Sequence, residues 1–109
     1  MKLAIIGSRN LSVGNLDDYI PKNVTEIVSG GARGIDTAAS NYAMEHGLKL
    51  KVFLPEYERY KRGAPLKRNL LIAEYADECI AFWDGESKGT MHTAECFRKL
   101  NKKVVVIKK

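Results

Sequence analysis

The octapeptide Ser29-Gly-Gly-Ala-Arg-Gly-Ile-Asp36 joins a short apolar run, residues 26–28, to a helical pattern that extends from Ile35 to His46. This order predicts a strand, a glycine turn and the first turn of a helix. Such a turn brings unpaired backbone N–H groups and the positive end of a helix dipole together, which suits an anion. We therefore interpret the octapeptide as the floor of a phosphate site. The alternative is a tight turn that needs glycine for its geometry alone.

The remaining sequence continues this alternation of strands and helices. We expect strands at residues 2–6, 26–28, 49–54, 78–83 and 103–108. We expect helices at residues 35–46, 65–76 and 91–101, a short helix capped by Ser12, and a long loop over residues 56–64. The strands are aliphatic rather than alternating, which is typical of a parallel sheet covered on both faces. The sequence thus predicts a three-layer α/β fold with strand order 3-2-1-4-5.

Length and composition limit the class of protein. A chain of 109 residues is expected to form one domain, residues 1–109. The net charge of +5 favours anionic partners. Cys79 and Cys96 are far apart, and we interpret them as reduced core thiols of a cytoplasmic protein, with a disulfide as the alternative. No apolar stretch approaches the ~18 residues of a membrane span, so no membrane association is expected.

Three loops are expected to meet at one edge of the predicted sheet. In this strand order the ligand crevice lies at the carboxyl ends of the strands, between the first and the fourth. The loops that reach it are residues 7–10, 30–36 and 84–90, and each is rich in glycine, serine or charge. Their convergence favours a binding role for the glycine turn. Neither a dinucleotide G-x-G-x-x-G fingerprint nor a P-loop motif is present.

The third of these loops ends in Ser87-Lys88-Gly89-Thr90, which we interpret as a second anion cradle at a helix start. An ordinary capped helix is the alternative. His92 and Glu95 follow three residues apart, at a spacing that fits either an acid/base pair or a solvated helix face. A metal ion would need more ligands than this pair, and the sequence predicts neither a metal site nor a cofactor.

A basic and aromatic segment occupies the middle of the chain. Its members are Tyr57, Arg59, Tyr60, Lys61, Arg62, Lys67 and Arg68. Cationic groups beside stacking rings suit single-stranded nucleic acid, or a nucleobase with its phosphates. A solvated loop is the alternative.

Several of these segments resemble known motifs. The octapeptide is similar to the S-G-x-A-x-G-I-D signature of the Rossmann-like core of the DNA-processing DprA (Smf) family. Further likeness lies in Arg68-Asn69-x-x-Ile72-Ala73, in Ser87-Lys88-Gly89-Thr90-x-x-Thr93-Ala94, and in the opening Ile5-Ile6-Gly7-Ser8-Arg9. These features also occur in the wider SLOG superfamily, which includes the LOG phosphoribohydrolases and the YpsA-like proteins.

The resemblance implies a Rossmann-like fold that binds nucleotides or nucleotide-derived ligands in the crevice. It implies ligand-binding roles for residues that match the family pattern: Gly7, Ser8, Arg9, Gly30, Gly31, Arg33, Gly34, Asp36, Arg68, Asn69, Ser87, Gly89 and Thr90. Lys88 adds positive charge to the same set.

Three functions are open from the sequence. The leading one is a binding domain for a nucleotide or nucleotide derivative. The second is hydrolysis of an N-glycosidic or phosphate bond in such a ligand, with Asp36, Asp84 and Glu95 as acid/base candidates. The LOG enzymes have a glutamate where this chain has Thr93, which counts against that reaction. The third is single-stranded DNA binding like that of DprA, which would gain contacts if copies of the chain formed a homo-oligomer.

Overall fold

The computed structural model describes residues 1–31 and 34–109. Its strands are β1 (Lys2–Gly7), β2 (Glu26–Ser29), β3 (Lys49–Val52), β4 (Glu78–Trp83) and β5 (Lys103–Lys108). Its α-helices are α1 (Ile35–Glu45), α2 (Tyr57–Tyr60), α3 (Ala64–Tyr75) and α4 (Lys88–Lys99). Two short 3-10 helices, η1 (Leu16–Asp18) and η2 (Lys61–Gly63), complete the elements.

The five strands form one sheet in the order β3-β2-β1-β4-β5. All four neighbouring pairs are parallel, with Ala4 of β1 lying opposite Val28 of β2 and Cys79 of β4. The predicted α/β class and strand order are therefore confirmed. The order reverses between β1 and β4, so the loops after these strands diverge to opposite sides and leave a crevice between them.

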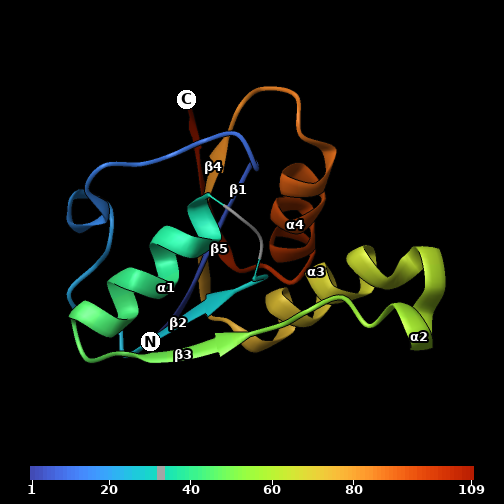
Figure 1. The fold of residues 1–109 in the computed structure, drawn as a ribbon, viewed down its shortest axis with the longest axis horizontal. Helices are drawn as coiled ribbons and strands as arrows, with labels where there is room; N and C mark the ends of the chain where they lie inside the picture. The colour runs from blue at the N-terminus through green and yellow to red at the C-terminus, as the bar shows by residue number, and fades with distance from the viewer. Residues whose placement is uncertain (32–33) are drawn as a thin grey trace.

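Helices cover the two faces of this sheet (Figure 1). Leu3 and Ile5 of β1 point to the face covered by α1, where they pack with Ile35 and Ala39. The alternate residues of β1, including Ile6, point to the face of α3 and α4, where their cluster includes Ile72 and Phe97. Because neighbouring side chains of a strand point to opposite faces, one aliphatic strand supplies both cores.

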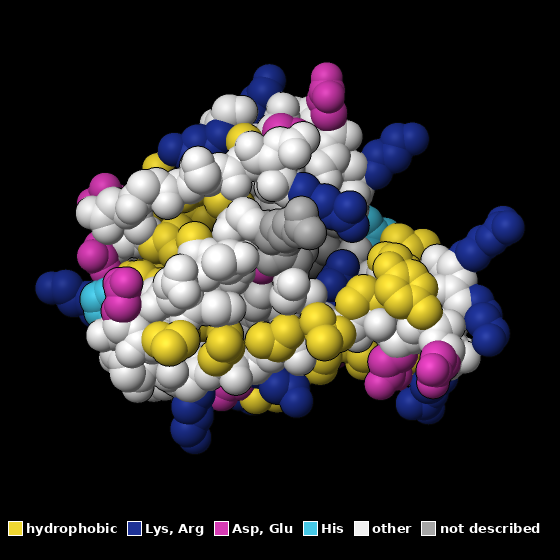
Figure 2. Space-filling model, in the orientation of Figure 1, with side chains coloured by type: hydrophobic (Ala, Val, Ile, Leu, Met, Phe, Trp, Pro, Cys, Tyr) yellow, Lys and Arg dark blue, Asp and Glu magenta, His cyan; other side chains and the backbone are white. Residues whose placement is uncertain are grey.

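The edge strand β3 differs from the expectation of buried aliphatic strands. All four of its residues are exposed, and lysine alternates with an aliphatic residue along Lys49-Leu-Lys-Val52. Figure 2 shows the exposed hydrophobic side chains as a row over β3 and the segment after it. Lysines on an edge strand discourage pairing with another chain, which explains their place here.

Three local predictions were wrong. Residues 56–64 are not a long loop, because α2 and η2 occupy most of the segment. Asn15, rather than Ser12, caps the short helix η1, through a hydrogen bond from the backbone N–H of Asp17 to Asn15 Oδ1. Helix α4 begins at Lys88 rather than Met91, because Ser87 already provides an N-cap.

Both cysteines are free and buried, as the reduced-thiol interpretation predicts. Burial raises the pKa of the Cys79 thiol far above its usual value, and it also raises the pKa of Cys96. None of the helices in the described part of the chain is long and apolar enough to span a membrane.

Candidate functional site

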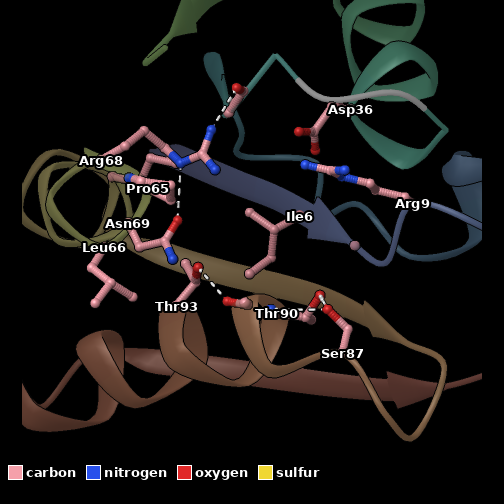
Figure 3. A pocket seen from close by; sticks show the side chains of 14 residues that line it. Ile6, Arg9, Asp36, Pro65, Leu66, Arg68, Asn69, Ser87, Thr90 and Thr93 are labelled. Atoms are coloured by element: carbon pink, nitrogen blue, oxygen red, sulfur yellow. Dashed lines mark hydrogen bonds between the residues drawn. The ribbon is translucent and has the colours of Figure 1, made fainter. Parts of the chain in front are cut away.

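A pocket of about 210 Å³ lies at the carboxyl edge of the sheet (Figure 3). Its floor is formed by Ile6 and Gly7 at the end of β1. The loop after β2 contributes Gly30, and the loop after β4 contributes Ser87. Helix α3 closes the remaining side. The pocket therefore occupies the crevice that the strand order predicts.

Arg68 of α3 is fixed across the pocket by two hydrogen bonds. Its Nη1 donates to the carbonyl oxygen of Gly30 at 2.8 Å, and its Nε donates to Asn69 Oδ1 at 2.9 Å. Burial lowers the pKa of Arg68, the nearby Asp36 opposes that shift, and Arg9 adds to it. An arginine has no accessible neutral form in proteins, so this guanidinium is a partly desolvated cation facing the pocket.

Asn69 connects this arginine to helix α4. Its side chain is buried, and its Nδ2 lies 3.2 Å from Nδ1 of His92. His92 is half-buried and also lies beside Cys96, whose Sγ is 3.9 Å from Nδ1 and 4.0 Å from Nε2. The amide is thus held from both of its ends, by α3 and by α4.

The first turn of α4 forms the wall opposite Arg68. Ser87 is the N-cap, and its Oγ accepts hydrogen bonds from the backbone N–H and the hydroxyl of Thr90 at 3.4 and 3.1 Å. Gly89 and Thr90 line the pocket. Because the first turn of a helix leaves backbone N–H groups without intrahelical partners, this wall is a favourable place for an anion.

The loop before α4 is held by a carboxylate and a buried hydroxyl. Asp84 Oδ1 accepts hydrogen bonds from the backbone N–H groups of Glu86 and Ser87, both at 2.8 Å. These bonds lower the pKa of Asp84. Ser8 Oγ, which is buried, accepts from the backbone N–H of Asp84 at 3.2 Å. Asp84 and Ser8 therefore shape the loop from behind the pocket.

The structure brings most of the predicted ligand-binding residues to this one pocket. Those that line it are Gly7, Arg9, Gly30, Asp36, Arg68, Asn69, Ser87, Gly89 and Thr90. Those that are described but do not line it are Ser8, Gly31, Gly34 and Lys88. Arg33, which we also predicted, lies outside the described residues.

The three acid/base candidates are in different places. Asp36 is buried in the first turn of α1 and lines the pocket. The Asp84 carboxylate accepts backbone hydrogen bonds within the loop before α4 and does not line the pocket. Glu95 pairs with Arg98 on the exposed face of α4. His92 and Glu95 therefore do not form a pair of their own, since His92 contacts Asn69 and Cys96 instead.

Five further residues of the site were missed by the reasoning from sequence. Four are apolar, Ile6, Pro65, Leu66 and Ile72, and the fifth is Thr93, whose hydroxyl donates to the Gly89 carbonyl. Ile6 and Ile72 have the pattern of core residues, and that pattern gives no sign that one side of the core is open. Leu66 is 52% exposed, so it lines the pocket from outside the core.

The charges of the site favour an anion. Among the residues that the structure describes, the pocket is lined by two arginines, Arg9 and Arg68, and by a single carboxylate, Asp36. Figure 2 shows further Lys and Arg side chains projecting from the side of the molecule that carries α2. Within the same described ranges, no group of three or more His, Cys, Asp or Glu side chains could hold a metal ion.

Comparison with known families agrees with this architecture. The model of the family described as DNA recombination-mediator protein A matches residues 1–56. The match covers about half of the 109 residues, and it includes β1, β2 and the loops that follow them. Arg68, Asn69 and the start of α4 lie beyond it. No curated protein and no solved structure matches the chain. The chain belongs to the DNA recombination-mediator protein A family.

Proposed function

We propose that the pocket binds the phosphate of a nucleotide or nucleotide-derived ligand. The observation that carries this proposal is the meeting of Arg9, Arg68 and the first turn of α4 around one cavity. A guanidinium can bind a phosphate through two parallel hydrogen bonds, and the backbone N–H groups of a helix start add directional donors. Arg68 uses its Nε–H and one N–H of Nη1 within the protein, so the second N–H of Nη1 and both N–H groups of Nη2 can serve a ligand.

The size of the pocket limits how much of a ligand can enter. Its volume of about 210 Å³ is below the range of about 300–1,000 Å³ typical of sites for drug-sized molecules. We therefore expect a phosphate with part of a sugar inside and the base at the rim. Leu66 lines the pocket and is 52% exposed, so it offers apolar surface for a base at that position.

The test is a thermal-shift panel with mononucleotides, dinucleotides, nucleotide sugars, ADP-ribose and short single-stranded DNA. A ligand that binds only the folded state raises the Tm. We expect one nucleotide class to raise the Tm of the wild type and of Arg98→Gln, but not of Arg68→Gln. Arg98 is the control because it is an exposed arginine of α4 that pairs with Glu95 away from the pocket. Equal shifts in both variants would contradict the proposal.

A second candidate is single-stranded DNA, which the family description and the surface beside the pocket both favour. Tyr57 is 58% exposed on α2. Arg59 and Lys67 lie over the ring of Tyr60, with Arg59 Cζ at 5.3 Å and Lys67 Nζ at 5.8 Å from the ring centroid. Exposed rings with cations beside them can stack bases and hold the backbone.

Salt dependence separates the two candidates. DNA binding at several phosphates releases counterions, so its affinity falls steeply as salt rises. The logarithm of the binding constant falls against the logarithm of the salt concentration with a slope of roughly 0.7 for each phosphate contacted on a single strand. A mononucleotide pocket responds much less. Arg62→Gln, an exposed change on η2 that leaves the pocket intact, should weaken DNA binding alone. If neither salt nor Arg62→Gln weakens DNA binding, the DNA is held in the pocket rather than on α2 and η2.

A further inference from the structure

We propose that His92 is a positioning residue for the pocket, acting through Asn69 on Arg68. This inference rests on the proposed function, because it concerns the arginine that would hold the phosphate. Three hydrogen bonds in series connect the groups: His92 Nδ1 to Asn69 Nδ2 at 3.2 Å, Asn69 Oδ1 to Arg68 Nε at 2.9 Å, and Arg68 Nη1 to the Gly30 carbonyl at 2.8 Å.

The chemistry of the groups fixes the direction of every bond in this series. The Nε of Arg68 can only donate, so Asn69 must present its oxygen to it. The amide NH₂ of Asn69 then points to His92, which must accept. His92 Nδ1 can accept only when it carries no proton, so the ring must be neutral, with its hydrogen on Nε2.

Among the residues that the structure describes, none offers His92 Nδ1 a stronger partner than Asn69. From α4, the Cys96 sulfur lies at nearly equal distances from the two ring nitrogens, so neither nitrogen is directed at it. Glu95, the next acid along the helix, pairs with Arg98. Lys99 of α4 and Lys67 of α3 line the adjacent groove with His92, and both are cations. His92 is only half-buried, so protons from solvent can reach it.

Protonation of His92 breaks the series. An imidazolium donates from both nitrogens, so Nδ1–H would face the NH₂ group of Asn69, donor against donor. If the amide turns over to present its oxygen to His92, its NH₂ group then faces Arg68 Nε, which is again a donor. The first arrangement loses the bond between His92 and Asn69, so the amide that accepts from Arg68 is no longer held, and the second loses the bond between Asn69 and Arg68 itself. Phosphate binding should therefore weaken on acidification more than in a variant whose residue 92 does not titrate.

The first test uses nuclear magnetic resonance without any ligand. In the neutral His92 ring we expect the proton on Nε2, because Nδ1 accepts from Asn69. The Arg68 Nε–Hε signal should shift when the solution is acidified far enough to protonate this ring. The shift should disappear in His92→Gln, whose side-chain oxygen accepts from Asn69 at every pH. It should persist in His46→Gln, because His46, the other histidine, pairs with Asp17 instead. A proton on Nδ1, or an equal shift in His92→Gln, would overturn the proposal.

The second test measures the affinity for inorganic pyrophosphate. The ratio of wild-type to His92→Gln affinity should be near one while the His92 ring is neutral and should fall about threefold to tenfold once acidification has protonated it, as expected from one weakened hydrogen bond. Using a ratio removes the ionisation of pyrophosphate itself. A constant ratio would overturn the positioning role. If pyrophosphate binds neither protein, the proposed function fails, and the Arg68 signal alone then decides whether the series exists.

Discussion

Arg68 Nη1 donates a hydrogen bond to the carbonyl oxygen of Gly30 at 2.8 Å, which joins α3 to the end of β2 across 38 residues of sequence. Gly30 does not have a positive φ, so it is not glycine for its backbone conformation. A Cβ built on Gly30 would lie 2.8 Å from Nη1 of Arg68 and 3.4 Å from Oδ2 of Asp36. The absence of a side chain at this position is what lets the guanidinium approach.

Gly30→Ala should therefore reduce ligand binding much more than stability. The atom that the new methyl group meets is the end of a flexible side chain, which can move away at small cost. We expect a loss of stability of about 1 kcal/mol or less, together with loss of the nucleotide-dependent Tm shift. Thermal denaturation with and without nucleotide measures both. Unchanged binding would show that the position of Arg68 is not needed.

The topology and the place of the crevice could be predicted from the sequence, whereas the contacts within the crevice could not. Aliphatic strands such as Lys2–Gly7 are buried on both faces, and their continuous run of aliphatic residues predicts this burial. Asn69 and His92 are 23 residues apart in the sequence, and the bond between them joins α3 to α4. It depends on how these two helices are rotated against each other. No local pattern encodes that rotation.

The roles of individual glycines were also beyond the sequence. Gly30 and Gly34 belong to the same octapeptide, but Gly34 has a φ of 73°, and a Cβ built on it would lie 2.8 Å from the carbonyl oxygen of Leu11 and 3.0 Å from that of Arg9. Gly30 is needed so that the Arg68 side chain can approach the backbone. Gly34 is needed both for its positive φ and because a Cβ would not fit there. Both appear simply as glycine in a turn.

Gly7→Ala should destabilise the fold. A Cβ on Gly7 would lie 2.4 Å from Cγ1 and 2.7 Å from Cβ of Ile35, which is fully buried in the core. Overpacking of this kind costs about 1–3 kcal/mol. The matched control is Gly89→Ala, because a Cβ on Gly89 would meet no atom within 4 Å. Urea denaturation should show a lower midpoint for the first variant and an unchanged or higher midpoint for the second; equal midpoints would contradict the argument.

Lys102→Met should destabilise the protein by removing a cation from the end of α3. Lys102 Nζ donates to the carbonyl oxygens of Ala73, Glu74 and Ala76 at 2.8, 3.0 and 2.8 Å. These carbonyls have no intrahelical partners at a helix C-terminus, and the negative end of the helix dipole favours a cation there. We expect a loss of about 2 kcal/mol. Lys103→Met, an exposed change on β5, should be nearly neutral in the same urea titration.

Asp84→Asn should make the protein less sensitive to acid. The pKa of Asp84 is lowered in the folded state, first by hydrogen bonds from the backbone N–H groups of Glu86 and Ser87. Its ionised form therefore stabilises the fold above the unfolded pKa of about 3.9, and this contribution is lost as the pH falls through the lower folded value. The variant should have a lower Tm than the wild type at neutral pH, and the difference should shrink below about pH 4. Asp18→Asn, an exposed change on η1, is the control. A difference that stays constant with pH would show that the charge of Asp84 does not hold the loop.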